Sequence, residues 1–290
     1  MQKLSLPQKW ILAGLLIAAA ILLTALIWTS AAGASPAPAE TAPGSVFMPA
    51  PPGPSETAVF ESPFFPVPET PGPEPTRPPP AKLIALTFDD GPWGPTERLL
   101  DALRERGLRA TFFVIGDHAG QYPGVLKRMA GEGHEIGNHT MNHKRLDKLP
   151  AASVKKELSD CSDLIEELTG IRPRLMRAPT GEITPAHMRE LERQGLACVY
   201  WSVDTKDWRA KSAGEIIEAA YHPEEEIHAI RDGAIVLMHD FYETSVDAAV
   251  ELMDRLVAEG YQLVTVSELL TIRKGGVEPG RLYGEGFKAG

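Results

Sequence analysis

His139 and His143 lie four residues apart and could hold one metal ion together with a nearby carboxylate. Residues at this spacing on a helical turn face the same direction, so both imidazoles can reach one ion. With one aspartate they form a set of two nitrogens and one oxygen, which leaves positions open for water and substrate. Zinc is the expected ion, and cobalt, nickel and manganese also accept such ligands. A pair of surface histidines without a metal is the alternative.

Two adjacent aspartates, Asp89 and Asp90, supply the carboxylate. They follow the apolar run from Leu83 to Phe88 directly. Successive side chains at the end of a strand point in opposite directions, so the two carboxylates are expected to have different tasks. One can coordinate the metal while the other meets a bound water. The same pair followed by Gly and Pro would also suit a solvated turn, but the apolar run that leads into it argues against a turn alone.

Further polar candidates follow other apolar runs. They are Arg177 in an Arg-Ala-Pro-Thr-Gly segment, Asp207 in an Asp-Thr-Lys-Asp-Trp segment, and the lone His239 after Leu237-Met238. Together with the metal candidates they supply an acid, a base and a ligand set. This inventory is typical of a hydrolytic metal site.

From Lys82 onward, apolar strand signals alternate with amphipathic helix signals. The expected strands are Leu83–Phe88, Ala110–Ile115, His134–Gly137, Leu175–Arg177, Ala197–Val203, Ala234–Met238 and Gln262–Val266. The expected helices include Thr96–Arg106, Ala151–Leu168, Pro185–Gln194 and Ser245–Glu259. This alternation predicts parallel βα units, and about 200 residues suit an irregular βα barrel. Every polar candidate then lies at the carboxyl end of a strand, on the rim where barrels build active sites.

The amino-terminal segment predicts a membrane anchor. Residues 1–9 carry Lys3 and Lys9 without an acid, and residues 10–28 carry no charge, which is long enough for a transmembrane helix. The two lysines place the amino terminus in the cytoplasm and the rest of the chain outside the cell membrane. Cleavage after a signal peptide near Ala34 is the alternative.

The remaining boundaries follow composition. Residues 29–81 form a proline-rich linker, since Ser35 to Ala81 contains sixteen of the 26 prolines. Residues 82–274 form the catalytic domain, and the glycine-rich tail of residues 275–290 is assigned no element. The formal charge of −10 argues against a nucleic-acid partner, which would need a basic face. Cys161 and Cys198 are expected to be buried free thiols.

The motifs resemble those of the NodB-homology polysaccharide deacetylases, carbohydrate esterase family four. Thr-Phe-Asp-Asp-Gly-Pro, His-Thr-x-x-His, Arg-x-Pro-x-Gly, Asp-x-x-Asp-Trp and Leu-x-His occur in that family's order, across about Lys82 to Leu270. The resemblance implies a distorted (β/α)7 barrel that removes N- or O-acetyl groups from glycans.

The resemblance also implies a role for each matching residue. Asp90, His139 and His143 would bind the metal. Asp89 would be the base and His239 the acid, with Arg177 paired with the base and Asp207 orienting the acid. Trp208 and Leu237 would line the pocket. Thr180 occupies the position where the family usually has Tyr, whose backbone N–H serves the oxyanion, so a pocket wall is missing and the choice of glycan is affected.

Three hypotheses follow for the function. The first is metal-dependent removal of acetyl groups from an extracellular N-acetylated glycan, with peptidoglycan favoured over chitin oligomers, an exopolysaccharide or acetyl xylan. The second is hydrolysis of an amide in a small or lipid-linked molecule, and the third is a non-catalytic glycan-binding module. A binding module has no need of Asp89 or His239. The remaining histidines are expected to have no catalytic role: His118, His134, His187, His222 and His228.

Overall fold

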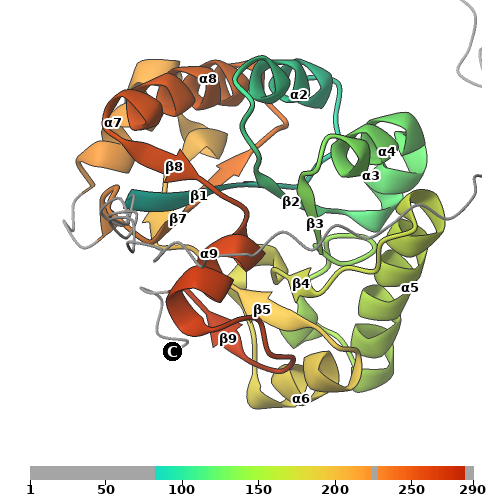
Figure 1. The fold of residues 1–290 in the computed structure, drawn as a ribbon. Coiled ribbons are helices and arrows are strands. Elements are labelled where there is room, and N and C mark those ends of the chain that lie inside the picture. The colour runs from blue at the N-terminus through green and yellow to red at the C-terminus, as the bar shows by residue number, and fades with distance from the viewer. Residues whose placement is uncertain (1–81, 224–227, 285–290) are drawn as a thin grey trace, which may run out of the picture. The chain divides into compact units, whose positions relative to one another are not determined.

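The computed structural model describes residues 82–223 and 228–284, which form an α/β domain built on parallel strands (Figure 1). The expected anchor and linker lie outside these residues. No helix among the described residues is both long and apolar enough to cross a membrane.

The strands pair in the order β6-β7-β1-β2-β3-β4-β5-β9, and β8 pairs with the first residues of β1. All of these pairings are parallel. The strand bounds are β1 Lys82–Asp89, β2 Thr111–Val114, β3 Glu135–Asn138, β4 Leu175–Met176, β5 Ala197–Val199, β6 Val203–Asp204, β7 Ala234–His239, β8 Tyr261–Leu263 and β9 Leu282–Tyr283.

The sheet curls into an incompletely closed barrel. β5 and β6 lie near opposite ends of the strand order but are joined only by residues 200–202. A connection this short spans at most about 14 Å, so the two ends of the sheet must approach each other. They do not pair with each other in the described part of the chain. The parallel α/β architecture predicted from the sequence is therefore confirmed, and the distorted barrel takes the form of a curled sheet that is not fully closed.

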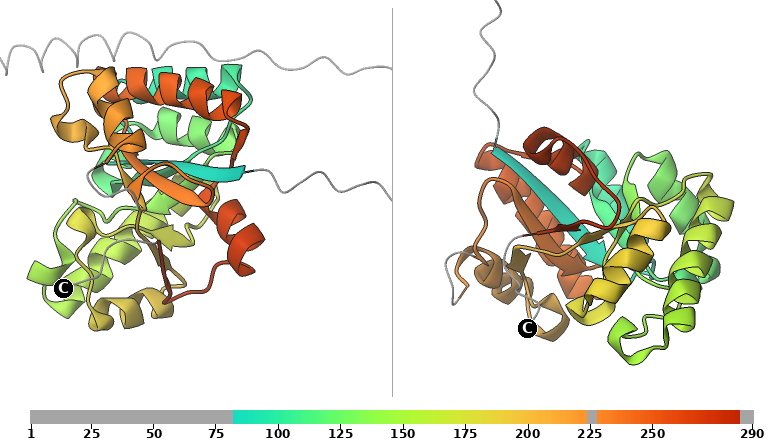
Figure 2. Two further views of the ribbon diagram at one scale, coloured as in Figure 1. Left: turned by 90° about the vertical axis from the view of Figure 1, so that its left-hand side faces the viewer. Right: turned by 90° about the horizontal axis from the view of Figure 1, so that it is seen from below.

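Most of the helices cover the outside of the sheet, as the two further views show (Figure 2), whereas α9 packs with Leu83 and Ala85 on the other face of β1. Their bounds are α2 Thr96–Glu105, α3 Gly116–Gln121, α4 Pro123–Gly131, α5 Ala151–Thr169, α6 Pro185–Arg193, α7 Ala213–Tyr221, α8 Glu243–Ala258 and α9 Val266–Lys274. Short 3-10 turns are η1 Leu146–Lys148, η2 Pro179–Gly181 and η3 Asp207–Arg209. Local signals explain several ends: Thr184 and Thr265 cap α6 and α9, and Gly170 ends α5 in the left-handed conformation.

Three expected elements differ from the structure. The strand expected over Ala197–Val203 is split into β5 and β6, and the one expected over Gln262–Val266 is β8, which ends at Leu263 because Thr265 starts α9. The tail after Gly275, for which the sequence predicts no element, supplies β9, whose Leu282 and Tyr283 pair with β5.

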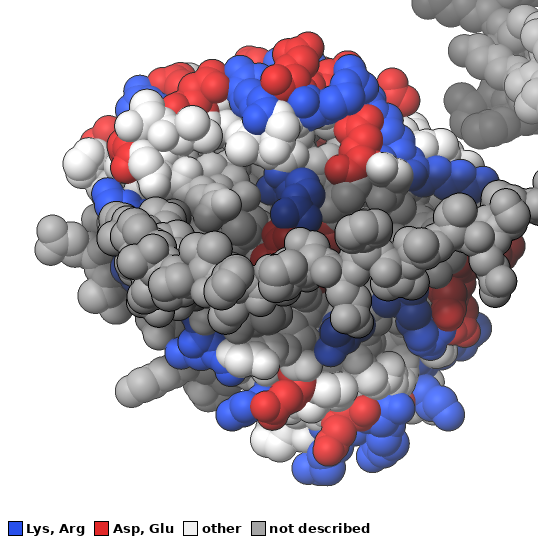
Figure 3. All heavy atoms as spheres, in the orientation of Figure 1, with Lys and Arg blue, Asp and Glu red and all other residues white. Residues whose placement is uncertain are grey.

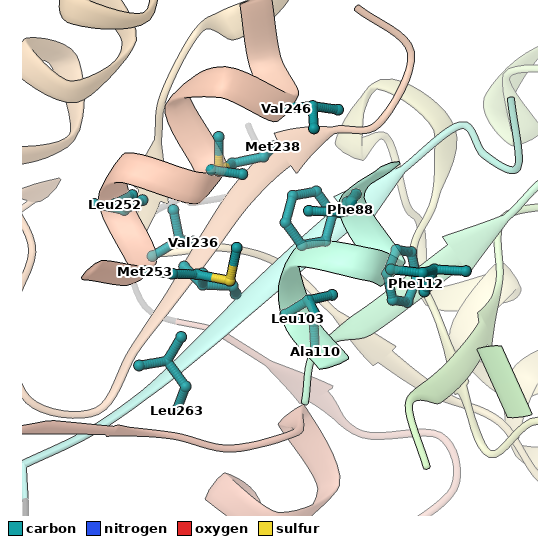
Figure 4. Close-up of a cluster of buried hydrophobic side chains, with 14 of the residues drawn as sticks. Phe88, Leu103, Ala110, Phe112, Val236, Met238, Val246, Leu252, Met253 and Leu263 are labelled. Carbon is teal, nitrogen blue, oxygen red and sulfur yellow. The ribbon is translucent and has the colours of Figure 1, made fainter. Parts of the chain in front are cut away.

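The central strand β1 is buried on both faces. Ile84, Leu86 and Phe88 pack outward into a cluster with α2 and α8, part of which Figure 4 shows. Leu83 and Ala85 belong to a second cluster, with residues of β2, β4, β5, β7 and α9. Because side chains alternate along a strand, Asp89 shares its face with Leu83 and Ala85. The strand therefore delivers one carboxylate toward the inside of the barrel.

Charges of both signs are interspersed on the visible face of the domain, over α8 and α2 (Figure 3). Many of these side chains pair with each other, as Arg98 does with Asp247 at 2.8 Å and Arg106 with Asp254 at 2.7 Å. Charges of opposite sign over α8 and α2 therefore largely neutralise one another.

Candidate active site

The strand ends bring the predicted site residues to one rim, as expected from the sequence. Asp89 and His239 end the neighbouring strands β1 and β7 and are register partners. His139 follows β3 directly, and Arg177 follows β4. Asp207 begins η3, just after β6. One cleft of about 700 Å³ is lined by Asp89, Asp90, His139, His143, Thr180, Trp208, Leu237 and His239.

Asp90, His139 and His143 form a cluster suited to a metal ion. Their ligand atoms all lie within 4.8 Å of one another. Oδ1 of Asp90 is 3.3 Å from Nε2 of His139 and 3.2 Å from Nε2 of His143. His139 is buried, whereas His143 is exposed.

The tautomer of His139 and the unpartnered oxygen of Asp90 both favour binding of a cation. Nδ1 of His139 lies 2.8 Å from the carbonyl oxygen of Arg177, so it carries the proton and Nε2 presents a lone pair to Asp90. Oδ1 of Asp90 is buried and lacks a hydrogen-bond partner among the described residues. Burial opposes the charged form of His139, yet Asp89 and Asp90 together raise the pKa of His139. The two carboxylates therefore attract positive charge to this cluster. A carboxylate oxygen facing imidazole lone pairs fits a divalent ion.

In the described part of the chain, five non-glycine residues adopt the left-handed backbone conformation, and all lie on the loops of this rim. They are Asp90, Thr140, His143, Thr180 and Lys206, with φ between 51° and 72°. Each costs on the order of 1–3 kcal/mol and persists only where the surroundings hold it, and such residues gather at functional sites. No pattern in the sequence predicts this conformation.

Hydrogen bonds hold the strained histidine loop in place. Oδ1 of Asn138 accepts from the Thr140 amide at 2.7 Å, and the Asn138 side chain donates to the Leu158 carbonyl at 2.8 Å. Glu157 of α5 accepts from the Asn142 amide at 2.9 Å. The two metal-binding candidates of this loop are thus positioned by α5.

Asp89 pairs with Arg177 inside the barrel. Oδ1 of Asp89 accepts from the Arg177 guanidinium at 2.7 Å, and both side chains are buried. Arg177 also donates to Thr87, to the Val199 carbonyl and to the Tyr200 carbonyl. Burial lowers its pKa, although the Asp89 carboxylate opposes that shift. Oδ2 of Asp89 lies 3.9 Å from Nε2 of His139, so it faces the metal-binding candidates.

His239 and Asp207 form a second pair. Nδ1 of His239 is 2.8 Å from Oδ1 of Asp207, and Oδ2 of the same carboxylate accepts from the His239 amide at 2.7 Å. Burial alone would lower the pKa of His239, but its contact with Asp207 outweighs burial and raises that pKa to about 9. Nε2 lies 3.9 Å from Oδ2 of Asp90, so the imidazolium faces the same centre as Asp89.

The pocket walls include residues that the sequence did not identify. His118, for which no role was expected, lines the cleft, and its Nδ1 lies 2.7 Å from the Asp90 carbonyl. Trp93, Trp201, Phe241 and Tyr242 also line the cleft. Only their proximity to the motifs could have indicated them, as Phe241 lies two residues beyond His239.

Asp240 is a further residue that sequence reasoning missed, although it follows His239 directly. It is fully buried, burial raises its pKa to about 7, and its Oδ2 accepts from Thr96 at 2.6 Å. A Cβ at position 91 would fall 2.3–2.7 Å from this carboxyl group. A side chain at position 91 would therefore collide with Asp240, so this close approach requires Gly91.

Other predictions on single residues are also resolved. His134 is buried, accepts from the Ala110 amide at 3.3 Å and packs edge-on against Phe112, so its expected packing role is confirmed. Cys161 and Cys198 are buried free thiols, as predicted.

Comparison with known proteins assigns the family. Residues 76–199 match the polysaccharide deacetylase family. A chitooligosaccharide deacetylase of Bradyrhizobium is 41% identical over 162 residues, which cover 55% of this chain and 71% of that protein. The chain belongs to the polysaccharide deacetylase family. The family that the motifs resembled is thereby confirmed.

Further relatives act on different glycans. The peptidoglycan-N-acetylmuramic acid deacetylase PdaC of Bacillus subtilis is 40% identical over 194 residues, which cover 67% of this chain and 40% of PdaC. The chain therefore spans less than half of that relative. A family 4 acetyl xylan esterase from Clostridium thermocellum, solved with a cobalt ion, has a TM-score of 0.63 and 31% identity, and the match covers 70% of this chain and 98% of that one.

Proposed function

We propose that this deacetylase uses a divalent metal ion to remove acetyl groups from an extracellular N-acetylated glycan, with peptidoglycan as the favoured substrate. One observation carries the proposal: a buried acid–base set and a metal-binding cluster face one another in a single cleft. PdaC and a peptidoglycan-N-acetylglucosamine deacetylase of Listeria monocytogenes, 37% identical over 189 residues, support peptidoglycan as the glycan.

Asp90, His139 and His143 would hold the ion, with zinc expected and cobalt, nickel or manganese also compatible with these ligands. Cobalt in the solved acetyl xylan esterase supports a divalent ion at such a site. When bound, the ion supplies a Lewis acid that acidifies water and polarises the acetyl carbonyl.

The chain's own side chains move the protons. Arg177 occupies Oδ1 of Asp89, which leaves Oδ2 to accept the proton of the attacking water. His239 is held as an imidazolium by Asp207, and its Nε2 can donate to the departing nitrogen. Leu237 and Trp208 would bound the acetyl pocket, and the backbone N–H of Thr180 would meet the oxyanion.

Placement outside the cell membrane is part of the proposal. It rests on the uncharged span of residues 10–28 after Lys3 and Lys9, and on the proline-rich linker that follows. The linker would let the tethered domain reach wall glycan from the membrane.

The test of the function is release of acetate by the purified full-length chain from peptidoglycan, chitin oligomers and acetyl xylan. We expect acetate from N-acetylated glycan, loss of activity on chelation, and recovery when zinc or cobalt is added. Mass analysis of the products identifies the sugar that loses its acetyl group. Full activity in a demonstrably metal-free sample would contradict the proposed mechanism.

The pH profile tests the role of His239. The imidazolium of His239 must donate a proton, so kcat/KM is expected to fall as the pH rises through the pKa of His239. That pKa is about 9 without a metal. A bound cation nearby opposes the positive charge of the imidazolium and would lower it. Asp207→Asn removes the partner that raises this pKa, and burial then lowers it toward or below the ordinary 6.5. The basic limb should move to lower pH by at least about one unit. A limb at the same pH in both proteins would show that another group is the acid.

A further inference from the structure

Two exposed aromatic side chains stand beside the proposed acid. Phe241 and Tyr242 follow β7 after one intervening residue, Asp240, and they are 39% and 42% exposed. Both line the catalytic cleft. An aromatic side chain left in water forgoes the burial of a large apolar surface, so an exposed pair at a binding cleft indicates a ligand that covers it.

The two rings are packed into a fixed arrangement. Phe241 and Tyr242 meet edge to face with centroids 4.6 Å apart. Trp93 supports Phe241 at 4.9 Å, also edge to face, and is itself 4.3 Å from the His118 ring. These contacts orient the rings before any ligand arrives.

The backbone on both sides of the pair is anchored to α2. On one side, Asp240 accepts a hydrogen bond from Thr96 at 2.6 Å. On the other, Arg98 donates to the Glu243 carbonyl at 3.0 Å and pairs with the Glu243 carboxylate at 2.8 Å. Phe241 and Tyr242 are therefore held between two fixed points, which is the arrangement that a preorganised binding surface requires.

We propose that Phe241 and Tyr242 form an aromatic platform that binds a second pyranose ring, next to the ring that loses its acetyl group. This inference rests on the proposed function. The C–H face of a pyranose is apolar and packs on an aromatic ring while its hydroxyl groups remain in water. Trp208, 56% exposed, lies beside Asp207, the partner of His239. Aromatic side chains therefore lie near both members of the acid pair: Phe241 and Tyr242 follow His239 in the chain, and Trp208 follows Asp207. This arrangement suits a cleft that binds a glycan chain.

The charges of the cleft favour a neutral glycan on this platform. Asp117 and Asp204 line the same cleft as the platform. These carboxylates disfavour an anionic lipid surface as the occupant of the platform.

Chain-length dependence tests the platform. The full-length enzyme is assayed on N-acetylglucosamine itself and on its five-sugar oligomer, and we expect a higher kcat/KM on the oligomer. In Phe241→Ala and Tyr242→Ala the ratio of kcat/KM between the oligomer and the monosaccharide should fall about tenfold, through KM, because only the oligomer reaches the platform. Val257→Ala, which trims an exposed apolar side chain at the far end of α8, should keep the wild-type ratio.

Phe241→Leu separates stacking from local packing. Leucine keeps an apolar contact with Trp93 but has no flat face for a sugar, so this variant should lose the length preference while it melts near the wild-type temperature. A wild-type enzyme without length preference, or variants that lose activity equally on the oligomer and the monosaccharide, would overturn the platform and leave the proposed function intact.

If the wild type releases no acetate from peptidoglycan, from the oligomer or from the monosaccharide, the proposed function fails by itself. Calorimetry with the five-sugar oligomer then decides about the platform. Binding that weakens about tenfold in Phe241→Ala supports it, and absent or unchanged binding refutes it.

Discussion

Asp89→Asn is expected to lower kcat by about 10²–10⁴ while the metal content stays near that of the wild type. Asparagine has almost the same shape and still offers Arg177 an oxygen acceptor, so the pair at 2.7 Å can persist. Its amide cannot take a proton from water, however. Acetate release at saturating substrate measures kcat, and elemental analysis of the purified protein measures the metal.

Asp90→Asn is the matched control for this substitution. It makes the same chemical change at the neighbouring residue. Oδ1 of Asp90, however, lies close to both His139 and His143. We expect this variant to lose metal, and activity with it. If Asp89→Asn loses the metal and Asp90→Asn keeps it, the two carboxylates have exchanged roles.

The fold was predictable where the local pattern was strong. The unbroken apolar run of β1 and the long amphipathic helix α5 lie within one or two residues of their expected bounds. The segment holding α3 and α4 carries no such pattern, because glycines and Pro123 interrupt it. Its helices instead depend on packing, with Leu126 and Met129 fully buried in the core. A strand as short as β9 depends on its partner β5, which the local sequence does not reveal.

The site was predictable because parallel strands carry their polar ends to one rim. What the sequence could not indicate were contacts between distant segments, such as Trp93 with Phe241 or Thr96 with Asp240. These residues form no sequence motif from which a shared role could be predicted. They meet only because β7 lies beside β1 in the sheet.

Thr180 illustrates how the backbone changes an interpretation. Judged from the sequence alone, replacing it by proline deletes only the N–H proposed for the oxyanion. Its φ of 62° is one that proline cannot adopt, because the proline ring fixes φ near −65°. Such a variant would distort η2 as well as remove the donor, so Thr180→Gly, which tolerates this conformation, is the safer probe of the side chain.

Arg177→Met is expected to destabilise the domain by about 3–5 kcal/mol. Arg177 is fully buried, and its guanidinium lies 4.2 Å above the Phe113 ring. Methionine fills much of the space but leaves the Asp89 carboxylate buried without its partner. Urea unfolding followed by circular dichroism measures the change. Arg172→Met is the exposed control, and it should cost at most about 1 kcal/mol although Arg172 pairs with Asp163 at 2.9 Å and Glu166 at 2.6 Å.

The double variant Arg177→Met with Asp89→Asn separates the charge from the packing. If the cost of Arg177→Met comes from the stranded carboxylate, neutralising position 89 should recover part of it, and the double variant should lose less stability than the two single variants summed. Residues in direct contact commonly couple by about 0.5–3 kcal/mol. Strict additivity would mean that Arg177 stabilises the barrel through its bonds to Thr87 and to the Val199 and Tyr200 carbonyls. The ion pair would then serve catalysis alone.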